Sequence, residues 1–86
     1  MPAFTKTIDT EYGNLNFYFN PIYTAEGVRY HVSAIAKDNS LKIFHLEPVG
    51  GSWRLVEKDS KQYWLIAIEQ KLSEAILQRE EYRDQK

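Results

Sequence analysis

The chain has 86 residues, 11 basic and 12 acidic side chains, a formal net charge of −1 and no cysteine. The absence of cysteine excludes disulfide bonds and thiolate metal sites, and the balanced charge is unlike the basic surface of most nucleic-acid-binding proteins. A chain of this length forms one domain, which we place at residues 1–86. Because so small a domain buries only a modest core, a second subunit is a common source of added stability.

No stretch near the N-terminus has the apolar centre of a signal peptide. The longest apolar run, YWLIAI at residues 63–68, is too short to cross a membrane. Since the chain also lacks cysteine, we expect a cytoplasmic protein of bacterial type that makes no membrane contact.

Before residue 57 the sequence has the pattern of short strands. A weakly patterned strand is expected at residues 4–9, and strict alternation of apolar and polar residues indicates a second strand at 14–20. Further strands are expected at 28–37, 41–47 and 52–56, and turn signals rich in Gly, Asn, Asp and Pro separate them.

Residues 60 to about 80 have the pattern of one long helix. Asp59 or Ser60 can cap its N-terminus, and Gln62 stands in the capping-box position. The side chains that repeat with helical spacing are Leu65, Ile68, Leu72, Ala75, Ile76 and Arg79. The sequence therefore predicts an α+β fold, in which an antiparallel four- to five-stranded meander precedes one long C-terminal helix packed on one sheet face.

Turn lengths predict how the strands pair. A two-residue loop at residues 50–51, both glycine, places Leu46 opposite Leu55. A four-residue loop at residues 24–27 places Phe19 opposite Val32. These pairs are favourable because both members are apolar.

The hairpin between these two is harder to place. A loop around Asn39 that pairs Lys37 with Lys42 sets Ile35 opposite Phe44. This register is the least favourable of the three because it brings two like charges together.

The three registers together predict a sheet with two apolar faces. One face holds Leu15, Phe17, Phe19, Val32, Ala34, Ala36, Ile43 and Val56. The other holds Tyr18, His31, Ile35, Phe44, Leu46, Trp53 and Leu55. One helix covers one face, so the second face is left to contact a partner.

We expect the second face to make a homodimer or to bind a protein partner, because two-fold dimers are the commonest way to bury such a surface. The predicted interface residues are Tyr18, Ile35, Phe44, Leu46, Trp53 and Leu55. A less favoured alternative is a binding module for single-stranded nucleic acid. Its predicted contacts are Tyr18, Arg29, His31, Lys42, Trp53 and Arg54. In a third alternative, the helix packs on this face and leaves the other one free.

No catalytic or metal site is predicted. His31 and His45 fall on adjacent strands but on opposite faces, so they cannot share a ligand. Ser33 lies about 7 Å along the strand from His31, which exceeds hydrogen-bond reach. The glycine pair at 50–51 lacks the following Lys-Ser/Thr of a phosphate-binding loop. We therefore expect a non-enzymatic domain with no cofactor and no metal.

The C-terminal half of the chain resembles small uncharacterised bacterial proteins that close with a Gly-x-Trp hairpin and a Trp-containing helix. The matching residues are Gly51, Ser52, Trp53, Trp64, Glu69, Leu72, Ala75 and Ile76. This resemblance implies no activity and no site. The order of four or five strands and then a helix is also similar to PUR-alpha-type single-strand nucleic-acid binders, and by fold analogy alone it implies the nucleic-acid alternative.

Overall fold

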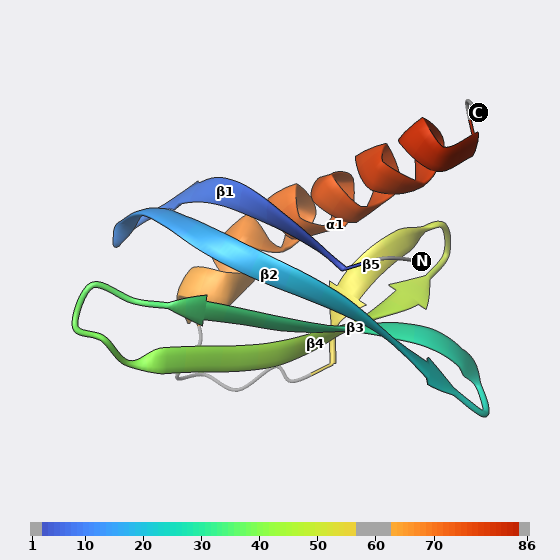
Figure 1. Cartoon of the computed structure of the whole chain (residues 1–86), viewed down its shortest axis with the longest axis horizontal. Helices are drawn as coiled ribbons and strands as arrows, with labels where there is room; N and C mark the ends of the chain where they lie inside the picture. Colours follow the sequence, from blue (N-terminus) through green and yellow to red (C-terminus); the bar gives the residue numbers. More distant parts are fainter. Residues whose placement is uncertain (1–2, 57–62, 85–86) are drawn as a thin grey trace.

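The computed structural model describes residues 3–56 and 63–84, which form one antiparallel sheet followed by one helix (Figure 1). The strands lie side by side in chain order: β1 (Phe4–Thr10), β2 (Gly13–Thr24), β3 (Gly27–Ile35), β4 (Leu41–Val49) and β5 (Ser52–Leu55). The helix, α1, covers Tyr63–Asp84. The predicted α+β meander with a terminal helix is therefore confirmed.

The helix lies closest to β5 and β1, the two edge strands of the sheet (Figure 1). The sheet curls, and both of its edges approach the same helix. The buried side chains of α1 are Trp64, Leu65, Ile68, Ser73, Leu72, Ala75 and Ile76. Five of the six predicted stripe residues are thus buried, whereas Arg79 is only partly buried, and Trp64 and Ser73 are added members. The predicted capping residues Asp59, Ser60 and Gln62 lie outside the described residues.

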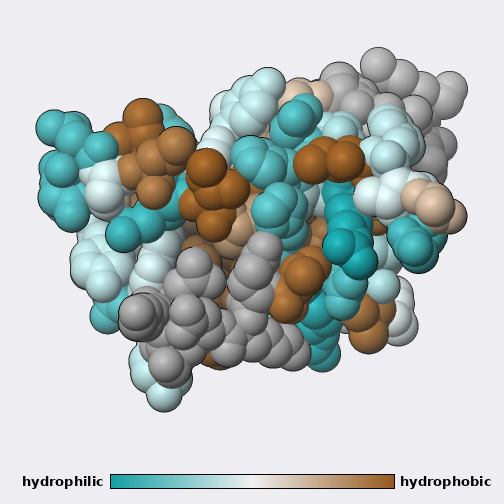
Figure 2. All heavy atoms as spheres, turned by 90° about the horizontal axis from the view of Figure 1, so that it is seen from below, coloured by the Kyte–Doolittle hydropathy of each residue, from teal (hydrophilic) through white to brown (hydrophobic). Residues whose placement is uncertain are grey.

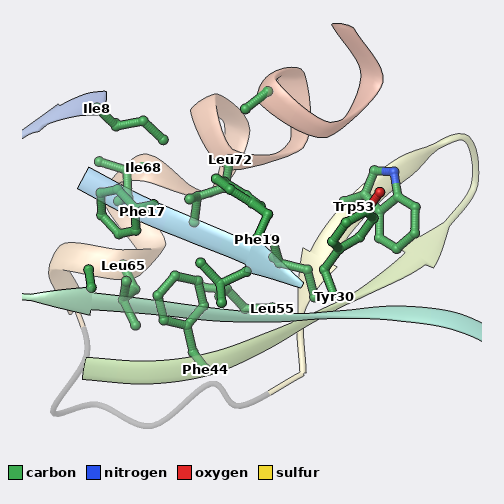
Figure 3. Packing of buried hydrophobic residues seen from close by; sticks show 14 of the residues in the cluster. Ile8, Phe17, Phe19, Tyr30, Phe44, Trp53, Leu55, Leu65, Ile68 and Leu72 are labelled. Carbon is green, nitrogen blue, oxygen red and sulfur yellow. The ribbon is translucent and has the colours of Figure 1, made fainter. Parts of the chain in front are cut away.

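One hydrophobic core fills the space between the helix and the sheet (Figure 3). Aromatic rings from different strands meet edge to face, a favourable arrangement of their charge distributions. The rings of Phe17 and Phe44 have centroids 6.1 Å apart, and those of Tyr30 and Trp53 are 5.0 Å apart. These contacts join β2, β3, β4 and β5 into one packed layer.

The structure confirms the registers of two hairpins. Leu46 lies opposite Leu55, as the two-glycine loop predicts, and Phe19 lies opposite Val32. Both glycines of the loop, Gly50 and Gly51, have positive φ angles of 57° and 85°. Glycine adopts such angles without a steric penalty, so the loop can be as tight as the prediction requires.

The predicted register of the β3–β4 hairpin is wrong. Lys42 lies opposite Ala34 and not opposite Lys37, and Phe44 lies opposite Val32. The strand is thus displaced by three residues from the predicted pairing. Because side chains alternate along a strand, a shift by an odd number moves each β4 side chain to the other face.

The face assignments of β4 and β5 must therefore be corrected. The side chains of Phe44, Leu46, Trp53 and Leu55, predicted to be exposed, are buried in the core under α1. The side chains of Ile43 and Val56, predicted to be inside, are exposed. Only one face of the sheet is densely apolar, and that face is the one the helix covers.

Helix side chains also accept hydrogen bonds from backbone N–H groups of the edge strand β5. The backbone N–H of Trp53 donates to the hydroxyl of the buried Ser73 at 2.9 Å, and the N–H of Leu55 donates to a Glu69 carboxylate oxygen at 2.8 Å. Unpaired groups on an edge strand invite pairing with another chain. Ser73 and Glu69 satisfy two of them, so α1 protects this edge as well as covering the core.

Candidate association surface

The face of the sheet opposite α1, called the outer face below, carries side chains from β1 to β5 that alternate with the core residues. Four large apolar side chains gather on it from β2, β3 and β4. Tyr18, Ile35, Leu41 and Ile43 are 47%, 63%, 60% and 46% exposed. We call these four residues the apolar patch.

The strand register explains why the apolar patch is continuous. Ile35 lies directly opposite Leu41, and Ser33 lies opposite both Tyr18 and Ile43 on its two neighbouring strands. Side chains directly opposite on adjacent strands lie about 5 Å apart at their β-carbons, so these residues are within contact range across the sheet. The patch therefore spans three strands beside the β3–β4 turn.

An open hollow of about 500 Å³ adjoins the apolar patch. Its lining includes Asn16, Tyr18, Ser33, Ile35, Lys37 and Leu41. In Figure 2, apolar residues lie at the left of the view, the end at which Figure 1 places the β3–β4 turn, and others lie among polar residues in the centre and on the right. The patch thus combines protruding apolar side chains with a concave area next to them.

The two histidines lie together in the next row of the outer face. His31 and His45 are directly opposite each other on β3 and β4. Their ring centroids are 5.1 Å apart, with ring planes at 67°. The prediction that they occupy opposite faces is wrong, and its cause is the same three-residue shift of the β3–β4 register.

Charged side chains form the row beyond the histidines. Arg29 makes an ion pair with Glu47 across β3 and β4 at 3.4 Å, and Glu47 lies opposite Arg54 of β5. Arg54 also reaches Glu69 of α1 at 3.3 Å. Since these pairs are partly exposed, each adds little to stability, but together they place both signs of charge on one row.

The structure divides the predicted interface residues between two places. Tyr18 and Ile35 remain on the outer face, whereas the other four, Phe44, Leu46, Trp53 and Leu55, are core residues. Leu41 and Ile43, which the prediction did not include, complete the exposed apolar area. The correct β3–β4 register would have revealed both residues. Side chains alternate along a strand, so Leu41 and Ile43 point outward when Phe44 points into the core.

The predicted nucleic-acid contacts are also divided. Four of them share the outer face: Tyr18, Arg29, His31 and Arg54. Trp53 is buried, and Lys42 lies beside Ala34, on the side of the sheet that faces the core. Both outer-face arginines have carboxylate partners, which lowers the positive charge available to a phosphate backbone.

Other surfaces of the described residues are less distinctive. An open groove of about 580 Å³ runs between β5 and α1, lined by polar side chains such as Gln70 and Glu74 together with Ile66. Within the described residues, no group of three or more His, Asp or Glu side chains is arranged to hold a metal ion. No helix in that part of the chain is both long enough and apolar enough to cross a membrane.

Comparisons of the chain with known proteins found no relative. The chain matches no protein-family model, and searches of curated proteins and of solved structures found no match either.

Proposed function

We propose that the protein is a non-enzymatic domain that self-associates through its outer face, with the apolar patch at the centre of the contact. The single observation that carries this proposal is the exposure of Tyr18, Ile35, Leu41 and Ile43 in neighbouring positions on three strands. Leaving apolar surface in water is unfavourable by about 25 cal/mol for each Å². Burial of this patch against a second surface removes that penalty.

A second copy of the chain is the partner that fits this face best. A two-fold contact brings the same surface of each copy together, so the surface must complement itself. The outer face has the features for this: protruding side chains beside a hollow, and a row in which Glu47 stands between Arg29 and Arg54. The net charge of −1 adds little repulsion between copies.

Sedimentation velocity over a concentration series tests the proposal. We expect the wild-type chain to approach dimer mass from low to high micromolar concentration. Leu41→Glu should shift it to monomer, because the new charge would be buried without a partner. Leu41 is exposed, so this change leaves the core intact.

The matched control is Ile66→Glu on α1, where the side chain is 44% exposed and lies away from the outer face. A wild-type monomer at every concentration, or equal effects of the two variants, would overturn the proposal.

Single-stranded nucleic-acid binding is the weaker second candidate. It is favoured by Tyr18 and His31, two rings on the same face as Arg29. Binding of this kind weakens steeply as salt rises, because neutralised phosphates release counterions. A gel shift with a single-stranded oligonucleotide at low and high salt measures it. Salt-sensitive binding that is lost in Tyr18→Ala would favour this candidate over self-association.

A further inference from the structure

We propose that His31 and His45 together form a binding site for one divalent transition-metal ion of the Cu²⁺, Ni²⁺ or Zn²⁺ class. The two imidazoles lie directly opposite each other on β3 and β4, on the exposed side of the sheet. Imidazole is a preferred ligand of these ions. The site is built within one chain and needs no second copy, although it lies on the outer face between the apolar patch and the charged row.

The ring separation fits a shared metal ion. When each ring binds the ion through one nitrogen at about 2.1 Å and the angle at the metal is about 90–110°, the ring centroids lie roughly 4.6–5.3 Å apart. The observed centroid separation of 5.1 Å falls in this interval. Rotation of each ring about its Cβ–Cγ bond redirects the nitrogens and leaves the centroid almost in place. The backbone therefore already holds both ligands at a chelating distance.

The chain concentrates its strongest transition-metal ligands at this point. It contains two histidines and no cysteine, so every imidazole in the protein belongs to this pair. Within the described residues, no third His, Asp or Glu side chain joins the pair to make a larger ligand group. Water then completes the coordination, which is the open arrangement of a site with exchangeable positions. Ca²⁺ and Mg²⁺ prefer several oxygen ligands and fit the pair poorly.

The surroundings of the pair suit a cation. Arg29 is the nearest guanidinium along β3, and its charge is offset by Glu47 at 3.4 Å. Arg54, the next cation on this row, is offset by Glu69 at 3.3 Å. Both histidines stand on paired strands in the interior of the sheet, with β2 on one side and β5 on the other. Ligands on rigid elements lose little freedom on binding, which favours a bidentate site.

Titration of the 86-residue chain with CuCl₂, followed by electron paramagnetic resonance, tests the site. We expect one Cu²⁺ per chain and nitrogen hyperfine structure from two imidazoles. His31→Asn and His45→Asn should each weaken the affinity by at least about tenfold, because the second ligand no longer acts at high effective concentration. The control Asn20→Ala, opposite His31 on the same face, should leave the affinity unchanged. Leu41→Glu should also bind Cu²⁺ normally, which separates this proposal from self-association.

A second measurement needs no variant. In long-range ¹H–¹⁵N spectra of the wild-type chain, ZnCl₂ should shift the signals of both imidazoles together. A shift of one ring alone, a copper spectrum with a single imidazole nitrogen, or unchanged affinity in either histidine variant would overturn the proposal. Absence of saturable binding to the wild type would overturn it as well.

Discussion

Ile43 and Phe44 are neighbours in β4 and belong to different environments. Phe44 is 0% exposed and packs against Phe17 under the helix, whereas Ile43 is 46% exposed on the outer face. Both side chains are large and apolar, so hydrophobicity does not separate them. Their positions follow from the β3–β4 register, which decides the side of the sheet to which every β4 residue points.

The largest expected effect contrasts these two neighbours. Phe44→Ala should lower the free energy of unfolding by about 3–5 kcal/mol, because it removes a fully buried ring and leaves a cavity. Ile43→Ala should lower it by less than about 1 kcal/mol when the chain is dilute enough to be monomeric. Urea denaturation followed by circular dichroism measures both. Equal losses in the two variants would mean that β3 and β4 do not pair with Phe44 opposite Val32.

Trp53 provides a second comparison between the core and the surface. Its side chain is 4% exposed and meets the Tyr30 ring edge to face. We expect Trp53→Ala to cost about 3 kcal/mol or more, close to the value for Phe44. Val56→Ala, on the outer side of the same hairpin, should change stability little. Unchanged thermal melting of the Trp53 variant would contradict its place in the core.

A smaller effect is expected where the helix meets the sheet edge. Ser73→Ala removes the acceptor of the Trp53 N–H and leaves that buried donor without this partner, which costs about 1–3 kcal/mol. The matched change is Ser52→Ala, which removes the hydroxyl of a partly exposed serine in β5. It should lower the free energy of unfolding by less than about 0.5 kcal/mol. Chemical denaturation compares the two serines. If they are equivalent, Ser73 does not stabilise the edge of β5.

Two of the three hairpin registers proposed from the sequence are correct, because short glycine-containing turns restrict the pairing of their strands. The helix was also predictable, since its apolar repeat and the alternation of the strands agree. The role of Ser73 and Glu69 as hydrogen-bond acceptors for β5 was not predicted, because it depends on which edge of the sheet the helix meets. Sequence periodicity carries no information on that contact.

The β3–β4 turn was the source of the wrong register and of the misplaced candidate sites. Its conformation depends on Asn39, a non-glycine residue with φ of 66°, and on a backbone hydrogen bond from Ala36 N–H to the Ser40 carbonyl at 2.9 Å. Asn is among the few residues that tolerate this backbone region, yet its presence does not by itself specify the loop length. The apolar patch and the histidine pair both follow from this one turn.

The smallest predicted effect concerns the hydrogen bonds that hold this turn. The Ser40 hydroxyl and the Ser40 backbone N–H both donate to the Asp38 carboxylate, and they lower the pKa of Asp38, with a further contribution from Lys42. Ser40→Ala removes the hydroxyl donor, which is the largest cause, so the pKa of Asp38 should rise toward its ordinary value. Carboxyl NMR titration measures this change, and Ser52→Ala at the start of β5 is the control that should leave it unaltered.

The sign of the accompanying stability change follows from the direction of the shift. A carboxyl group with a lowered pKa in the folded state stabilises the fold above its ordinary pKa, and it loses that contribution as pH falls through the lowered value. The wild-type turn should therefore weaken only in acid, and in Ser40→Ala this small acid dependence should diminish. Because Asp38 is exposed, solvent keeps the effect slight. Hydrogen exchange of the Ala36 amide across the acidic range would detect it, and an identical pH profile in both proteins would show that the Ser40 hydroxyl does not contribute to holding the register of β4.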